Sequence, residues 1–179
     1  MRYRRDDTKG GTWFFTVNLA ERRKTYLLDE IVLLRHAVSS VKQRHPFTIN
    51  AIVVLPDHIH AIWTLPEQDN DFSTRWGLIK AGFSRKLSKT ERINRSRTGK
   101  GERGIWQRRY WEHLIRNERD YEQHVNYIHY NPVKHDYVDN PADWPYSSIH
   151  RYIRYGILEK NWSSRVAGID AKGYGEPVV

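Results

Sequence analysis

The sequence contains no cysteine. Disulfides, thiolate catalysis and zinc or iron–sulfur sites ligated by cysteine are therefore excluded. Long apolar segments are also lacking. No run approaches the ~20 residues of a membrane-spanning helix, and no apolar part of a secretory leader follows the charged start over residues 1–7. We therefore expect a soluble, cytoplasmic protein.

Acidic residues are in deficit, because 21 Asp and Glu stand against 30 Lys and Arg. The resulting formal net charge of +9 favours a polyanionic partner, and nucleic acid is the first candidate. The chain has 179 residues, of which 39% are hydrophobic, so it can bury a core without disulfides or a structural metal. We expect one folded domain over residues 1–179.

The order of the hydrophobic patterns predicts an α+β fold. Aromatic and β-branched runs are typical of strands, whereas apolar residues at every third or fourth position are typical of amphipathic helices. These patterns predict, in order, a strand over 12–19, a helix over 29–44, strands over 47–55 and 58–65, a helix over 72–87 and a strand over 105–115. The order β-α-β-β-α-β is that of a ferredoxin-like antiparallel sheet with helices on its faces.

The rest of the chain carries further local signals. Residues 88–104 are rich in Arg, Lys, Ser, Thr and Gly, which predicts a mobile basic loop. Asn117 can cap a helix that we expect to stop at Pro132, because the residue before a proline is pushed out of helical geometry. We expect a short helix over 147–155 and a flexible tail over about 165–179.

The pattern His58-Ile59-His60 falls on the predicted strand 58–65. Alternation along a strand places both imidazoles on one face, side by side, where they can bind one divalent ion. Such an ion, with open positions, can polarise a phosphodiester. The alternative is that one histidine is an ordinary satisfied polar residue and the other is solvated. A metal site needs a third ligand.

Tyr127 and Asn131 are four residues apart on a predicted helix and are therefore neighbours on its surface. If Tyr121, Val125 and Ile128 form the core stripe, both lie on an adjacent, partly polar face. Tyrosine can act as a covalent nucleophile, but its phenol, with a pKa of about 10, needs a polarised phosphate or a nearby base at neutral pH. The alternative is that the tyrosines of this helix only pack their rings and expose their hydroxyls to water.

Five collinear segments resemble the REP-associated tyrosine transposases, which are domesticated relatives of the single-tyrosine HUH transposases. The segments are GGTWFFTVN (10–18), VLPDHIHAIW (54–63), IWQRRYWEH (105–113), YIHYNPVKH (127–135) and WPYSS (144–148). They span nearly the whole chain. The resemblance implies the HUH endonuclease fold with extra C-terminal helices, in a bacterial protein of the cytoplasm that associates with the nucleoid.

The resemblance further implies a metal-dependent endonuclease and strand transferase that acts on single-stranded DNA. His58 and His60 match the HUH pair, Tyr127 matches the nucleophile, and Asn131 stands where the better-known insertion-sequence enzymes have glutamine. The implied cofactor is Mg²⁺ or Mn²⁺, held by His58, His60 and Asn131. Tyr127 would attack a DNA phosphate to form a 5′-phosphotyrosine link, and the released 3′-hydroxyl could reverse the reaction without ATP.

The implied substrate is a hairpin of repetitive extragenic palindromic (REP) DNA, and the implied oligomeric state is a monomer. Cations that neutralise phosphates and rings that stack on unpaired bases suit this partner. We expect DNA contacts from Arg4, Arg5, Lys9, Trp13, Arg85, Arg95, Arg97, Lys100, Arg103, Arg108 and Arg109. The alternative is that the basic loop is only solvated and that most rings are core.

Two other functions would use the same features differently. A protein that binds hairpin DNA or RNA without cleaving it would need the basic loop but not the set of His58, His60, Tyr127 and Asn131. A metal-dependent hydrolase would use a metal-bound water in place of tyrosine and would leave no covalent adduct between protein and DNA.

Overall fold

A four-stranded antiparallel sheet forms the centre of the computed structural model, which describes residues 7–89, 91, 93, 95–162 and 174. The strands are β1 (Thr12–Asn18), β2 (Thr48–Val54), β3 (His58–Thr64) and β4 (Trp111–Leu114), in the spatial order β2-β3-β1-β4. Because β1 and β3 are the inner strands and the helices connect the sheet in the predicted order, the ferredoxin-like α+β fold is confirmed.

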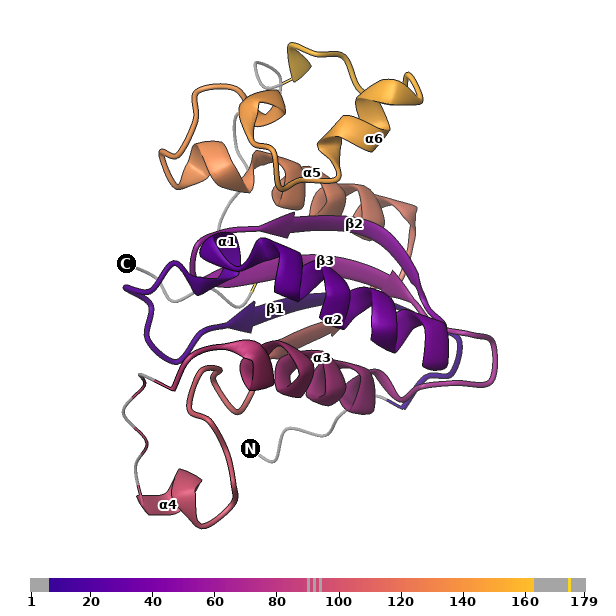
Figure 1. Ribbon diagram of the computed structural model, residues 1–179. Helices are drawn as coiled ribbons and strands as arrows, with labels where there is room; N and C mark the ends of the chain where they lie inside the picture. The colour runs from indigo at the N-terminus through magenta and orange to yellow at the C-terminus, as the bar shows by residue number, and fades with distance from the viewer. Residues whose placement is uncertain (1–6, 90, 92, 94, 163–173, 175–179) are drawn as a thin grey trace.

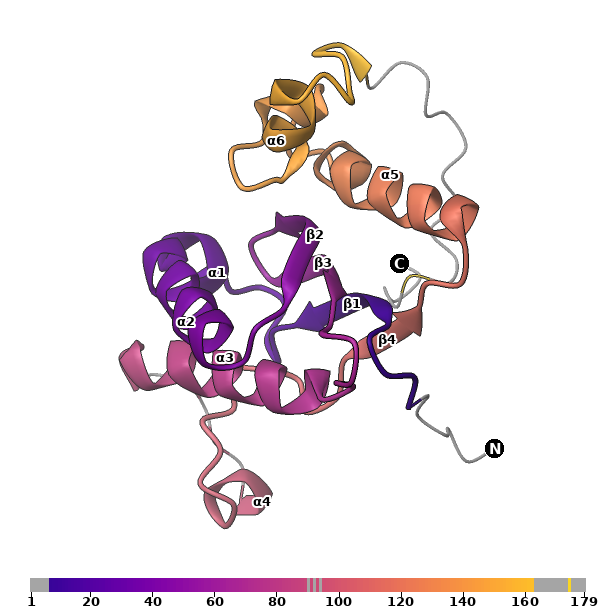
Figure 2. The ribbon, with the colours of Figure 1, turned by 90° about the vertical axis from the view of Figure 1, so that its right-hand side faces the viewer.

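Helices cover both faces of the sheet (Figures 1 and 2). One face packs against α1 (Tyr26–Asp29), α2 (Ile31–Arg44) and α3 (Phe72–Lys86), and the other packs against α5 (Glu118–Lys134). The remaining elements are α4 (Arg95–Thr98), η1 (Pro141–Asp143) and α6 (Ile149–Arg154). In the part of the chain that the structure describes, no helix has the length and apolarity to cross a membrane.

The inner strand β3 is buried on both faces, and its alternation divides the core in two. Ile59, Ala61 and Trp63 join the cluster under α2 and α3. Ile62 joins the cluster under α5, and His58 and His60 are on the same side of the strand as Ile62. The prediction that the two histidines share one face is therefore confirmed, and that face is the one that α5 covers.

Two predicted boundaries are wrong for reasons of packing. Only Trp111–Leu114 of the stretch 105–115 is a strand, because Ile105 and Trp106 are buried in the core beside α3 and Trp106 has only one isolated bridge, to Leu19. Helix α5 does not stop at Pro132 but continues to Lys134. A proline within a helix costs one hydrogen bond, because it has no N–H donor. Pro132 is buried against its surroundings, and its carbonyl still accepts from Tyr137 N at 3.0 Å at the end of the helix.

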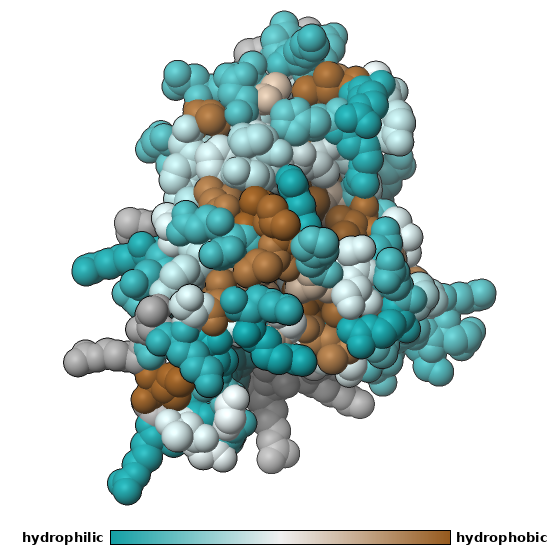
Figure 3. All heavy atoms as spheres, viewed as in Figure 1, coloured by the Kyte–Doolittle hydropathy of each residue, from teal (hydrophilic) through white to brown (hydrophobic). Residues whose placement is uncertain are grey.

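The outer edge of β2 is covered by the chain segment that precedes α6. Val54 N donates to Tyr146 O at 2.9 Å, and Ser148 N donates to Ile52 O at 2.8 Å. Beside this edge, hydrophobic side chains gather near the middle of the face shown in Figure 3. They line a groove of about 520 Å³ between α2 and the residues before α6.

The remaining predictions concern the basic loop, a short helix and the tail. The basic loop 88–104 contains the short helix α4. The short helix expected over 147–155 is present as α6. Apart from Tyr174, the tail expected over about 165–179 lies outside the described residues.

Candidate active site

Pairing of β1 with β3 places the two histidines opposite polar residues of β1. His60 is opposite Thr16, and His58 is opposite Asn18. The imidazole centroids of His58 and His60 are 4.8 Å apart, and the two residues are 1% and 0% exposed. Side-by-side imidazoles at this spacing can converge on one ion.

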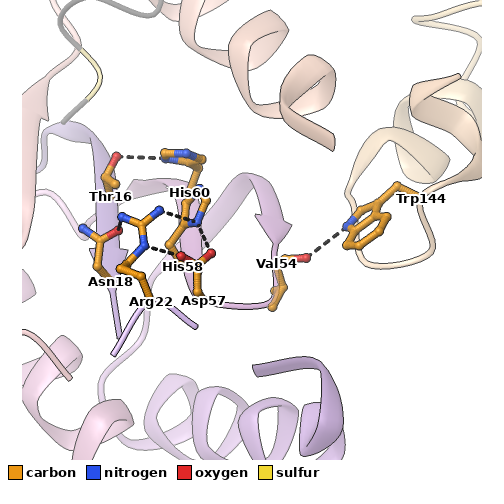
Figure 4. Close-up of polar contacts among 8 residues, drawn as sticks. All are labelled: Thr16, Asn18, Arg22, Val54, Asp57, His58, His60 and Trp144. Atoms are coloured by element: carbon orange, nitrogen blue, oxygen red, sulfur yellow. Dashed lines mark hydrogen bonds and ion pairs between the residues drawn. The ribbon is translucent and has the colours of Figure 1, made fainter. Parts of the chain in front are cut away.

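A hydrogen-bond chain through Thr16 fixes the tautomer of His60. The Thr16 hydroxyl donates its one hydrogen to the main-chain carbonyl of Tyr174, so it accepts from His60 Nδ1–H across 2.8 Å (Figure 4). The imidazole lone pair then lies on Nε2, which is the nitrogen that a divalent cation would bind. Support of this kind, on the nitrogen that does not ligate, is the usual arrangement around metal-binding histidines.

Asp57 plays the corresponding role for His58. Its carboxylate accepts from His58 Nδ1 at 2.7 Å and also pairs with Arg22, whose second nitrogen donates to Asn18 Oδ1 at 3.1 Å (Figure 4). Burial acts to raise the pKa of Asp57, but its hydrogen bonds and charge interactions with His58 and Arg22 outweigh burial and lower that pKa. Asp57 is therefore a carboxylate at neutral pH. Our sequence analysis missed Asp57 as a site residue, although its place directly before the histidine pair is a usable signal.

Tyr127 lies on α5 against the histidine pair. Its ring centroid is 5.2 Å from that of His60, and the residue is only 1% exposed. Tyr174 stacks on the other side at 3.8 Å, and Lys134 Nζ donates to the phenol oxygen at 3.1 Å. We expected Tyr127 on a partly polar face next to the core stripe; it lies instead within the buried cluster of Val125 and Ile128, because this face of α5 packs on the sheet.

Asn131 lies one turn beyond Tyr127 and is fully buried. One turn further on, the ring of His135 is 5.3 Å from that of His58. Both histidines of β3 therefore face the stretch of α5 that carries Asn131. Two imidazoles and one amide oxygen, drawn from β3 and α5, fit a divalent cation that keeps open positions for water or a phosphate oxygen.

A second cluster, His113, Asp120 and His124, offers ligand atoms that all lie within 4.8 Å of one another. Here the groups bind each other: Asp120 accepts from His113 Nε2 at 2.9 Å and lies 3.0 Å from His124 Nδ1. His124 Nδ1 is also 2.8 Å from the carbonyl of Asp120, which can only accept, so that nitrogen carries a hydrogen. With the hydrogen on Nδ1, this geometry is that of a hydrogen-bonded triad that links β4 to α5.

Nine of the eleven residues expected to bind DNA fall into three groups. Lys9, Arg85, Arg95, Lys100 and Arg109 have exposed side chains, as a phosphate contact requires. Arg97 and Arg108 join the basic loop to the segment that follows it, since Arg97 donates to the carbonyl of Trp106 and Arg108 pairs with Glu102. Arg4 and Arg5 lie outside the described residues.

Arg103 and Trp13 do not have the roles we expected. Arg103 pairs with Glu91 and donates to the carbonyls of Leu87 and Ser88, so its charge holds the basic loop to the end of α3. Trp13 is 1% exposed and packs on Phe72 with ring centroids 4.7 Å apart. A ring enclosed in this way offers no face to a base. Among the aromatic residues of the segment 105–113, Trp111 reaches the surface, at 40% exposed.

Helix α4 of the basic loop lies away from the histidine pair, whereas the residues directly after the loop run beside β1. Figures 1 and 2 both place α4 below α3, at the opposite end of the molecule from α5 and α6. Between α3 and the loop lies a cavity of about 630 Å³, lined by Arg85, Arg97 and Arg108 among others. In its wall, burial lowers the pKa of Lys80 to about 8. Arg95, in α4, therefore lies away from the candidate active site, whereas Arg109 is two residues after Gln107, whose N–H donates to Asn18 O at 3.0 Å.

Comparison with known proteins gives concordant results. The sequence model of the family described as "Transposase IS200 like" matches residues 13–131. The chain is 48% identical, over 94% of its length and 94% of the other chain, to a REP-associated tyrosine transposase of Escherichia coli K12. It also resembles a solved structure of a REP-associated tyrosine transposase bound to a REP hairpin, with a TM-score of 0.84 and 46% identity over 100% of this chain and 99% of that one.

Proposed function

Because the chain belongs to the REP-associated tyrosine transposases, within the IS200-like transposase family, we propose that it cleaves single-stranded DNA beside a hairpin and transfers the cut strand through Tyr127. The Tyr127 oxygen attacks a phosphorus atom, the bond from phosphorus to the 3′-oxygen breaks, and a 5′-phosphotyrosine link forms. Attack by a 3′-hydroxyl on this link reverses the step and joins strands. The bond energy is conserved in the link, so no ATP is consumed.

The observation that carries this proposal is the packing of Tyr127 against His60, with ring centroids 5.2 Å apart. His58, His60 and Asn131 would hold Mg²⁺ or Mn²⁺ next to the nucleophile. When bound, the ion polarises the phosphate and offsets its developing charge. Asp57 and Thr16 orient the two imidazoles from their Nδ1 atoms.

We propose a REP hairpin as the DNA partner, because the related protein whose structure is similar is bound to one. The exposed cations Lys9, Arg85, Arg95, Lys100 and Arg109 suit its phosphates. In this arrangement the hairpin would contact the basic loop and its unpaired foot would lie at Tyr127. Since that substrate is chromosomal, the protein acts at the nucleoid in the cytoplasm.

We also propose that the protein acts as a monomer. An uncovered edge strand is a template for pairing with a second copy. In this chain the outer edge of β2 already bonds to the segment before α6, through Tyr146 and Ser148, and to the side chain of Arg151. Joining of two sheets at this edge would first have to displace that segment.

The test is covalent capture of DNA. Labelled single-stranded oligonucleotides that carry the palindromic repeats of the source genome are incubated with Mn²⁺, and adducts are separated under denaturing conditions. We expect a denaturation-resistant adduct with the natural protein and none with Tyr127→Phe, while the hairpin affinity changes little. Tyr130→Phe, three residues along the same helix, is the matched control.

Three results would contradict the proposal. An adduct that persists in Tyr127→Phe would identify another nucleophile. Cleavage without an adduct would favour a hydrolase that uses metal-bound water. Hairpin binding without cleavage, at any Mn²⁺ or Mg²⁺ concentration, would favour a binding protein.

A further inference from the structure

We propose that Lys134 is a catalytic residue that acts on the oxygen of Tyr127, an inference that rests on the proposed function. Its Nζ donates to the phenol oxygen at 3.1 Å and lies 5.0 Å from the ring centroid. The ammonium group therefore contacts the atom that would attack the phosphorus. Lys134 lies within the segment 127–135 that carries the family resemblance, but the sequence analysis gave it no role.

The continuation of α5 beyond Pro132 makes this contact available. Lys134 is seven residues after Tyr127, which is close to two helical turns, so both lie on the face that carries Asn131. Side chains on a helix lean toward its N-terminus, and the long lysine side chain therefore reaches back toward the phenol. If α5 ended before Pro132, residue 134 would leave this face.

The contact suits the chemistry of a phenol nucleophile. A phenol has a pKa of about 10 and is a weak nucleophile while it keeps its proton. A hydrogen bond from an ammonium group stabilises the phenolate, and more strongly where the oxygen is shielded from water, as for a residue that is 1% exposed. In the attack the phenol proton passes to water, the bond from oxygen to phosphorus forms, and the bond to the 3′-oxygen breaks. The 3′-oxygen takes a proton from water, and Lys134 stays charged throughout.

A purely structural role is a weaker account of the same contact. The ring of Tyr127 is already positioned by α5, by the ring of Phe14 at 6.2 Å and by that of His60 at 5.2 Å. Lys134 adds a charge at the oxygen. It lies at the end of the tyrosine side chain, where the reaction takes place.

The experiment measures the rate of adduct formation with Mn²⁺ for Lys134→Ala, Lys134→Arg and the natural protein. Lys42→Ala, at an exposed lysine in the last turn of α2, is the control. Once the cut site is mapped, each protein is also given an oligonucleotide with sulfur in place of the 3′-bridging oxygen at that site. A thiolate leaves without a proton, so this substrate separates help to the nucleophile from help to the leaving group.

We expect Lys134→Ala to form the adduct about 100-fold more slowly on both substrates, as for the loss of one charge-stabilising donor. Added ethylammonium or the Lys134→Arg change should restore part of the rate, with hairpin affinity and melting temperature unchanged. The inference is overturned if Lys134→Ala reacts at the natural rate, if only the oxygen substrate is slowed, or if neither ethylammonium nor arginine restores any rate. A natural protein that forms no Tyr127-dependent adduct would instead overturn the proposed function, and this inference with it.

Discussion

At the residue level, the groups behind the two histidines decide whether their imidazoles can bind a cation. Asp57 accepts the Nδ1–H of His58 and is itself held by Arg22, so the lone pair of His58 is directed to Nε2. A neutral amide in place of this carboxylate would accept more weakly and would leave the Arg22 charge uncompensated. The affinity of the proposed metal site would therefore depend on a residue that would not touch the ion.

Asp57→Asn should raise the Mn²⁺ concentration needed for half-maximal adduct formation by about 10- to 100-fold, the usual effect of losing the partner behind a ligating histidine. The measurement is a Mn²⁺ titration of adduct formation at constant hairpin concentration. Asp139→Asn, at an exposed carboxylate, is the control and should leave the titration unchanged. If Asp57→Asn titrates like the natural protein, Asp57 does not orient a metal ligand.

His129 is a second buried histidine of α5, and it should make stability depend on pH. Burial, followed by the charges of Arg151 and His150, lowers its pKa to about 3 from an ordinary value of 6.5. The folded state therefore keeps His129 neutral in a range where the unfolded chain takes up a proton. Its contribution to stability is complete above about pH 6.5 and is lost as the pH falls from there toward 3.

Between pH 7.5 and pH 5, this one group should lower the free energy of unfolding by about 2 kcal/mol. Urea denaturation of the natural protein and of His129→Gln at the two pH values measures the difference. Glutamine can keep the hydrogen bond to Ser148 but does not titrate. Acidification should therefore lower the free energy of unfolding of the variant by that amount less than it lowers that of the natural protein. Equal losses in the two proteins would show that His129 is not the titrating group.

At the level of elements, the segment before α6 joins β2 to α5. Ser148 Oγ accepts from Ile52 N at 2.9 Å and lies 2.9 Å from His129 Nε2. One hydroxyl thus satisfies a strand edge and a buried imidazole together. The same segment is what covers the β2 edge against a second copy.

Ser148→Ala should lower the free energy of unfolding by about 1–3 kcal/mol, because it leaves a buried donor and a buried imidazole nitrogen without this partner. Urea denaturation at pH 7.5 measures it, with Ser39→Ala on the exposed side of α2 as the control. Hairpin affinity should not change. A loss no larger than that of the control would mean that water replaces the hydroxyl and that the segment is held by other contacts.

What the sequence predicts of these elements follows from local periodicity. A period of two places His58 and His60 on one face of β3, and a period near four makes Tyr127 and Asn131 neighbours on α5. The pairing of His60 with Thr16 could not be predicted in this way, because the two residues are 44 positions apart and meet only when β1 and β3 align. The end of α5 was mispredicted because tertiary packing offsets the one hydrogen bond that Pro132 cannot make.

At the level of the whole molecule, the positive charge divides between structural and surface roles that composition does not distinguish. Arg103 is as basic as its neighbours in the sequence, yet it binds Glu91 and the carbonyls at the end of α3. Arg95, Lys100 and Arg109 belong to the same stretch and have exposed side chains. Only the folded chain separates the two kinds.

This division predicts two different outcomes of removing charge from the basic loop. Affinity falls as the salt concentration rises, and each phosphate contact that is lost makes the slope of log affinity against log salt less steep by ~0.7–0.9. The combined variant Arg95→Gln, Lys100→Gln and Arg109→Gln should therefore weaken hairpin binding at low salt and lower that slope by up to about 2–3, with its melting temperature unchanged. Arg103→Gln should lower the melting temperature, because it breaks a partly buried ion pair and the bonds to the carbonyls at the end of α3. Binding titrations from 50 to 300 mM salt, roughly the range over which counterion release dominates, measure both variants. An unchanged slope in the triple variant would place the hairpin away from the loop, and a normal melting temperature in Arg103→Gln would return Arg103 to the set of free surface cations.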